Sequence, residues 1–164
     1  MVNNKTYNNL IDTLEQLGVN HYQIQQVSSG DIFEMDLEKN TLYPLMHIVP
    51  QTVVASQGQF TFNFQVFIMD LVEPDESNEQ EVLSDCLSIC TDIIATFKHG
   101  ESLFKFNAEH GEEERYFVDN DFTIEPFTER FDNAVSGWTF TIPIIVEQDY
   151  NSCNVPQPTT PIGK

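Results

Sequence analysis

The chain has 164 residues, of which 26 are acidic and 7 are basic, so its formal charge at pH 7 is −19. This charge excludes the usual mode of nucleic-acid binding, which needs lysines and arginines gathered on one face, and it disfavours an anionic membrane surface. The length suits one domain with its own core, and an aromatic content of 12% is too high for a disordered chain.

The first predicted element is an amphipathic helix that Gly18 is expected to end. Its apolar residues, which recur at helical spacing, are Tyr7, Leu10, Ile11, Leu14 and Leu17. A strand-like segment at 21–27 follows, and a turn at 28–30 comes after it. Residues 31–37 fit either a short strand or a helical turn.

Residues 43–54 and 59–72 are predicted to form a long β-hairpin around a turn at 56–58. Pro44 and Pro50 exclude a helix in the first segment and suit the start or the edge of a strand. In the second segment apolar and polar residues alternate, which indicates a strand with one buried face that becomes buried on both faces towards its end. The residues expected on the buried face are Phe60, Phe62, Phe64, Val66 and Ile68.

The main core helix is predicted to follow the acidic loop 73–80 and to run to about residue 98. Ser77 or Asn78 can cap its N-terminus through a capping box, and Gly100 is expected to end it. The residues expected to be buried are Val82, Leu83, Cys86, Leu87, Cys90, Ile93, Ile94 and Phe97.

The last third of the chain is predicted to be mostly extended. We expect a short strand at 103–107, an exposed loop at 108–115, an extended segment at 122–130 in which Pro126 stops a regular strand, and a corner at 131–135. The final strand is expected to turn Trp138, Phe140, Ile142, Ile144 and Val146 inward.

This order of elements predicts an α+β fold, with an antiparallel or mixed β-sheet flanked by two main helices. Residues 1–150 are expected to form a single domain, and the Pro-rich residues 151–164 an extended C-terminal arm. The sequence shows neither a secretory signal nor an apolar run long enough to span a membrane. We therefore interpret Cys86, Cys90 and Cys153 as reduced thiols in a cytosolic setting.

No motif in the sequence indicates catalysis or metal binding. The four histidines are scattered, and the spacings typical of zinc sites, hydrolase nucleophiles and phosphate-binding loops do not occur. His47, which apolar residues flank on a predicted strand, is interpreted as a core histidine with satisfied hydrogen bonds. We expect no enzyme, no metal and no cofactor.

The stretch EPFTERFDNAVSGW, residues 125–138, permits both a chemical and a structural interpretation. Glu125, Glu129 and Asp132 surround Arg130. A nuclease would need a lysine and a basic groove here, whereas the spacing alone also permits a glycosidic acid pair. The structural alternatives are an intrachain ion pair and a charge clasp across a subunit boundary. The candidate subunit-interface residues are Glu125, Phe127, Glu129, Arg130, Asp132 and Trp138.

Three segments together, YPLMHIVPQ, FNFQVFIMDLVEPDESNEQEVLSD and EPFTERFDNAVSGWTFTIPIIV, resemble small structural proteins of tailed bacteriophages. They are most similar to the tail-terminator or tail-completion group, whose members form rings at the head–tail junction, and the resemblance covers about residues 5–150. It implies a sheet flanked by helices, no catalytic residues, and assembly of this chain with itself as a hexamer or a dodecamer.

The resemblance further implies a place in the virion, with assembly in the host cytoplasm. The expected neighbours are portal, adaptor, neck or tail-tube proteins, and DNA would pass through the ring without specific binding. An acidic lumen would repel DNA phosphates and let a genome slide. The strands around 43–72 and the Pro-rich tail are candidates for pairing with neighbouring subunits.

Two other functions stay open at this point. An acidic protein can mimic DNA and inhibit a basic DNA-binding protein, which predicts a monomer or dimer. A small enzyme could use Glu125, Glu129 or Asp132, which predicts that an activity is lost when Glu129 is replaced by glutamine.

Overall fold

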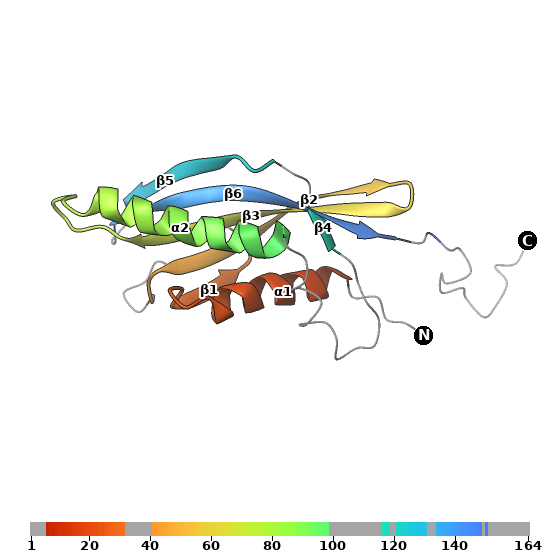
Figure 1. Ribbon diagram of the computed structural model, residues 1–164, viewed down its shortest axis with the longest axis horizontal. Helices are drawn as coiled ribbons and strands as arrows, with labels where there is room; N and C mark the ends of the chain where they lie inside the picture. The colour runs from red at the N-terminus through yellow and green to blue at the C-terminus, as the bar shows by residue number, and fades with distance from the viewer. Residues whose placement is uncertain are drawn as a thin grey trace, which may run out of the picture.

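The computed structural model describes residues 6–31, 41–98, 116–118, 121–130, 134–148 and 150. Over these residues two helices pack against one mixed sheet, as Figure 1 shows, so the predicted α+β fold is confirmed. The elements are α1 (Thr6–Asn20), β1 (Gln26–Ser29), β2 (Leu45–Ser56), β3 (Gln59–Leu71), α2 (Glu79–Lys98), β4 (Tyr116–Val118), β5 (Ile124–Arg130) and β6 (Ala134–Glu147).

The centre of the sheet is the antiparallel pair β3 and β6, which are in register from Gln59 opposite Glu147 to Leu71 opposite Val135. β2 joins the other side of β3 as its hairpin partner, and β1 pairs with β2 in parallel. On the far side of β6, β5 pairs with its first half and β4 with its last part. The order is therefore β1-β2-β3-β6-β4, with β5 beside β4 on the same edge of β6.

Both helices cover one face of this sheet, and the main core lies between the two layers. Alternate residues of β3 and β6 face the helices, as the alternation in the sequence predicts. The strand residues buried there are Phe62, Phe64, Val66, Ile68, Phe140, Ile142, Ile144 and Val146, whereas Phe60 and Trp138 are half-buried.

A smaller apolar cluster lies on the other face of the sheet, near the C-terminal end of β3. Leu45, Phe67, Met69 and Val135 are buried in it, and Phe127 packs at its side. β3 therefore becomes buried on both faces towards its end, which confirms the prediction for this strand.

The first helix ends two residues later than predicted, at Asn20. Gly18 lies within the helix and is buried. A Cβ at this position would lie only 2.7 Å from both the sulfur of Met46 and a methyl of Val27. The glycine therefore lets α1 approach the sheet and does not end the helix. Tyr7 is 43% exposed, so it lies outside the buried stripe to which the sequence assigns it.

The strand predicted at 21–27 is shorter than expected and lies at Gln26–Ser29, so Ser28 and Ser29, which were predicted to be in a turn, belong to β1. His21 and Ile24 instead make turns, in which their N–H groups donate to the carbonyls of Gly18 and His21. These local bonds use the backbone groups that an extended segment would offer to a neighbouring strand.

The main helix begins at Glu79, with Asn78 as its N-cap residue, because the Asn78 carbonyl accepts the first helical bond from Val82 at 3.0 Å. The Asn78 side chain does not serve as the predicted capping box. It accepts a hydrogen bond from the N–H of Glu73 at 2.8 Å, which closes the preceding loop onto the helix.

The buried stripe of α2 differs from the prediction at two positions. Leu87 is 37% exposed, whereas Ile89, which the prediction omitted, is buried. Leu83 and Ile94 are half-buried at the border of the stripe. The helix packs on β3 and β6, and contact with these strands decides which residues lie at the border of the buried stripe.

Two of the three prolines within described strands, Pro126 and Pro50, lie at edges, whereas Pro143 lies in β6 opposite Asn63, between the residues that pair with β5 and those that pair with β4. β5 continues through Pro126, which pairs with Trp138, so the prediction that Pro126 stops the strand is wrong. β5 has β6 as its neighbour on one side, and an edge strand tolerates a missing N–H. Pro50 lies in β2 beyond the residues that pair with β1, as predicted for an edge.

Several predictions fall outside the described residues. They concern residues 32–37, the strand at 103–107, the loop at 108–115, the corner at 131–133, and the C-terminal arm at 151–164. These stay predictions.

Candidate functional site

We call residues 124–138, of which 131–133 lie outside the described part of the chain, the β5 corner. Its two strand segments place the predicted interface residues Phe127 and Trp138 on two faces of the sheet. Phe127 lies on the face away from the helices, where its ring meets that of Phe67 edge-on at a centroid distance of 5.1 Å. Trp138 lies on the helix-covered face, and its Nε1–H donates to the carbonyl of Leu83 in α2 at 2.7 Å. The tryptophan therefore joins the sheet to α2 within one chain.

The charged members of this corner are only partly described. Glu125 is exposed on β5, opposite Thr139 of β6. The backbones of Glu129 and Arg130 pair with β6, but their side chains and the whole of Asp132 lie outside the described part of the chain. The intrachain ion pair and the clasp across a subunit boundary both stay predictions.

A buried polar group lies beneath this corner, at the start of α2. Ser136 is 1% exposed and donates from its Oγ to Oε1 of Glu79 at 3.1 Å, and the Thr128 hydroxyl lies 3.3 Å from the same oxygen of Ser136. A serine nucleophile must reach its substrate and needs a general base beside it. Because Ser136 is buried, it cannot reach a substrate from this position. Its bond to Glu79 instead holds α2 on the sheet.

The two described histidines also have structural partners. His47 is fully buried, and its two ring nitrogens lie 2.7 Å from the Ser28 hydroxyl and 3.3 Å from the Asp31 carbonyl, which confirms it as a satisfied core histidine. His21 lies 3.1 Å from the carboxylate of Asp92 and links the end of α1 to α2.

Cys86 and Cys90 face the core as free thiols, as predicted. Burial raises the pKa of each to about 12, and the carboxylates of Asp70 and Asp85 add to the effect at Cys86. A thiol with such a pKa is protonated at neutral pH and is a poor nucleophile. Among the described residues no cluster of three His, Cys, Asp or Glu side chains suits a metal ion, and no helix there could span a membrane.

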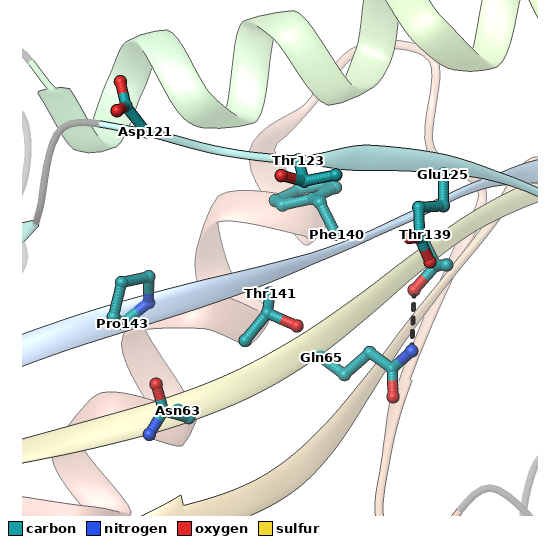
Figure 2. A pocket seen from close by; sticks show the side chains of 9 residues that line it. All are labelled: Asn63, Gln65, Asp121, Thr123, Glu125, Thr139, Phe140, Thr141 and Pro143. Atoms are coloured by element: carbon teal, nitrogen blue, oxygen red, sulfur yellow. Dashed lines mark hydrogen bonds between the residues drawn. The ribbon is translucent and has the colours of Figure 1, made fainter.

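The open face of the sheet carries a polar groove of about 310 Å³, which Figure 2 shows. Its floor is formed by uncharged residues of β3 and β6, and its wall by the segment that leads into β5. The lining residues are Asn63, Gln65, Asp121, Thr123, Glu125, Thr139, Phe140, Thr141 and Pro143.

The amides on the groove floor are already bonded within the chain. Gln65 donates to the hydroxyl of Thr139 at 3.1 Å and accepts from the amide of Gln51 at 2.9 Å. Asn63 donates to the carbonyl of Thr52 at 3.1 Å. These bonds form a polar ladder that ties β2, β3 and β6 together, so the groove floor stabilises the sheet.

Charge is unevenly distributed over the described surface. Residues 41–69, which include nearly all of β2 and β3, contain no Asp, Glu, Lys or Arg. The exposed acids that the structure describes are Asp12, Asp31, Glu73, Asp75, Glu76, Glu81, Asp85, Asp92, Asp121, Glu125 and Glu147. They belong to the helices, the loops, β5 with the segment before it, and the end of β6.

The uncharged hairpin of β2 and β3 extends past the ends of both helices, as Figure 1 shows. β1 pairs with β2 only at residues 45–48, so at residues 49–56 the described strands cover β2 on its β3 side alone. Val53 and Val54 in this part are about half exposed, at 49% and 50%. We call the outer side of residues 49–56 the β2 edge.

The sequence predicted the hairpin and made its strands candidates for subunit pairing, but the prediction did not use the uncharged run of residues 41–69. The groove and the buried Ser136 group depend on contacts between distant segments and have no local signal. No protein-family model matches the chain, and neither does any curated protein.

Proposed function

We propose that this chain is a structural virion protein of a tailed bacteriophage, which forms a homo-oligomeric ring at the head–tail junction or the tail end. DNA passes through this ring without specific binding, and the chain has no enzymatic role. Its neighbours are portal, adaptor, neck or tail-tube proteins.

The observation that supports this proposal is the separation of the acidic residues from an uncharged hairpin. A chain with a formal charge of −19 keeps residues 41–69 free of charge, and these residues form a hairpin that extends beyond the helices. Copies that repel one another through acidic surfaces can meet where charge is absent. The acids on the helix layer, such as Asp85 and Asp92, then stay available to repel DNA phosphates in a channel.

A ring makes a specific demand on the subunit. Closed cyclic assemblies use two different patches of each copy, so that every copy presents one patch and receives the other. Strand β2 of the hairpin and the β5 corner lie towards opposite edges of the sheet, since the strand order runs from β2 through β3 and β6 to β5. This arrangement provides two lateral surfaces, and the β5 corner includes the predicted interface residues Glu125 and Phe127.

Native mass spectrometry of the purified full chain, with negative-stain microscopy, tests the proposal. We expect a six-fold or twelve-fold ring, and peptides of the chain in purified phage particles. A protein that stays a single copy at high concentration and is absent from particles contradicts the proposal.

The second candidate function is that of an acidic DNA mimic, which the exposed acids of α2 favour. Glu81, Asp85 and Asp92 are exposed along α2, and regularly spaced carboxylates can imitate a row of phosphates. In this case the same measurement gives a monomer or dimer, and a basic DNA-binding protein forms a tight complex with it.

A further inference from the structure

We propose that the β2 edge is a pairing surface that takes a strand from another copy of this chain. The inference rests on the proposed ring and names the surface through which its copies meet.

The backbone of the β2 edge is a template for strand pairing. An edge strand presents a row of outward N–H and C=O groups, which pair readily with another chain. At residues 53–56, β2 is in regular register with β3, from Val53 opposite Phe62 to Ser56 opposite Gln59. The carbonyls of Thr52 and Ser56 already accept hydrogen bonds, from the Asn63 amide at 3.1 Å and from the Tyr150 hydroxyl at 2.7 Å, so a second strand would pair at residues 53–55. β4 and β6 also pair over three residues, so this length is enough for a strand contact in this sheet.

The side chains do little to protect this edge. Soluble proteins protect their edges with charged residues, prolines or bulges. Pro50 and the register shift between Pro50 and Val53 protect only the start of the β2 edge. Val53 and Val54 are uncharged, half-exposed and adjacent, so they present apolar surface on both faces of the strand.

Charge identifies another copy of this chain as the partner. A basic protein would bind the acidic helix layer, where attraction is strongest, and would gain nothing from an uncharged edge. A partner that is itself strongly acidic is repelled by the acidic helix layer and meets the least repulsion at an uncharged edge. Each copy carries a formal charge of −19, and residues 41–69 contain none of it.

The substitution Val54→Glu tests this surface, with Val19→Glu as the matched control. Both valines are exposed, at 50% and 60%, and both variants add one negative charge, but Val19 lies at the end of α1. Native mass spectrometry and sedimentation velocity measure assembly, and circular dichroism measures folding. We expect Val54→Glu to weaken assembly at least tenfold, whereas Val19→Glu assembles like the original chain.

Hydrogen exchange of the unsubstituted chain gives a second readout that does not depend on a variant. Amides in residues 49–56 should exchange more slowly in the assembled protein than in the dissociated protein. Equal exchange in the two states, or full assembly of a folded Val54→Glu, overturns the β2 edge and leaves the ring proposal standing. An original chain that never assembles overturns both.

Discussion

At the scale of single residues, Gly137 shows how closely the two central strands approach. It lies in β6 opposite Met69, and a Cβ at this position would overlap the carbonyl oxygen of Ile68 and lie 2.7 Å from the Cα of Met69. Both obstacles are backbone atoms, which cannot rotate away as the end of a side chain can. Any side chain here must displace β3 from β6.

We therefore expect Gly137→Ala to lower the free energy of unfolding by about 3 kcal/mol or more, since it forces a shift in the centre of the sheet. Urea denaturation followed by circular dichroism measures the change. Gly58→Ala is the control, because no atom lies within 4 Å of a Cβ there, and its cost of about 1 kcal/mol arises from a φ of 77°. Equal losses in the two variants would show that the close contact at Gly137 is unimportant.

Asp70 is a residue whose charge opposes folding. Burial raises the pKa of its carboxyl, the N–H of Leu71 acts against this by donating to Oδ1 at 2.7 Å, and the carboxylate of Asp85 raises it further. The folded state therefore holds the proton more tightly than the unfolded state does. As the pH rises through the carboxyl's pKa in the folded protein, stability falls.

Asp70→Asn removes this charge and keeps an acceptor for Leu71. We expect it to stabilise the protein at pH 7 by less than about 1 kcal/mol, because a half-buried carboxylate keeps part of its hydration. The gain should shrink as the pH falls, since the aspartate itself then becomes neutral. Thermal unfolding from pH 4 to pH 8 measures it, and a gain that grows towards low pH would refute this account.

At the scale of elements, α2 is held on the sheet by polar contacts at its N-terminal half as well as by its buried stripe. Trp138 donates to the carbonyl of Leu83, and Ser136 donates to Glu79. Both contacts come from the start of β6, at the end of the stretch 125–138 that the sequence singles out. That stretch therefore includes the strand residues that position the helix.

Trp138→Phe tests this role, because phenylalanine keeps an aromatic ring but cannot donate to Leu83. The loss of one half-buried hydrogen bond and of part of the ring should lower the free energy of unfolding by about 1–2 kcal/mol. Chemical denaturation measures the loss, and hydrogen exchange should become faster in the first half of α2. Unchanged exchange in α2 would place the role of Trp138 elsewhere.

At the scale of the whole molecule, the separation of charge decides how salt acts on assembly. Copies with a formal charge of −19 repel one another, and salt screens this repulsion, since the Debye length falls from about 20 Å at 20 mM to about 5 Å at 300 mM. We expect the ring to become more stable at the higher salt concentration, as sedimentation velocity would measure. A DNA mimic bound to a basic protein has the opposite dependence, so the two candidate functions differ in sign.

The two helices and the strands β3 and β6 could be predicted because each has a periodic signal, whereas the three-residue strand β4 was not predicted. The alternation from Phe60 to Ile68 and the apolar stripes of the two helices identify which faces are buried, and the uncharged run of residues 41–69 is visible without any structure. The predicted ends of the elements were less accurate where a residue that looks like a local stop signal is needed instead for packing between distant segments. Gly18 is an example, since it allows contact with Met46 and Val27 and does not end the helix.

The sequence by itself determined the two helices, the long strands β2, β3 and β6, the buried faces of the helices and of β3 and β6, and the strong excess of acid, because these properties depend on the order of neighbouring residues. It did not predict β4 at Tyr116–Val118. Only the tertiary structure decided that β1 joins β2 in parallel, that β5 continues through Pro126, and that residues 49–56 are left with an open edge. These features depend on which distant segments meet. Pairing between distant strands is set by the packing of the whole chain and leaves no repeating pattern in any one segment.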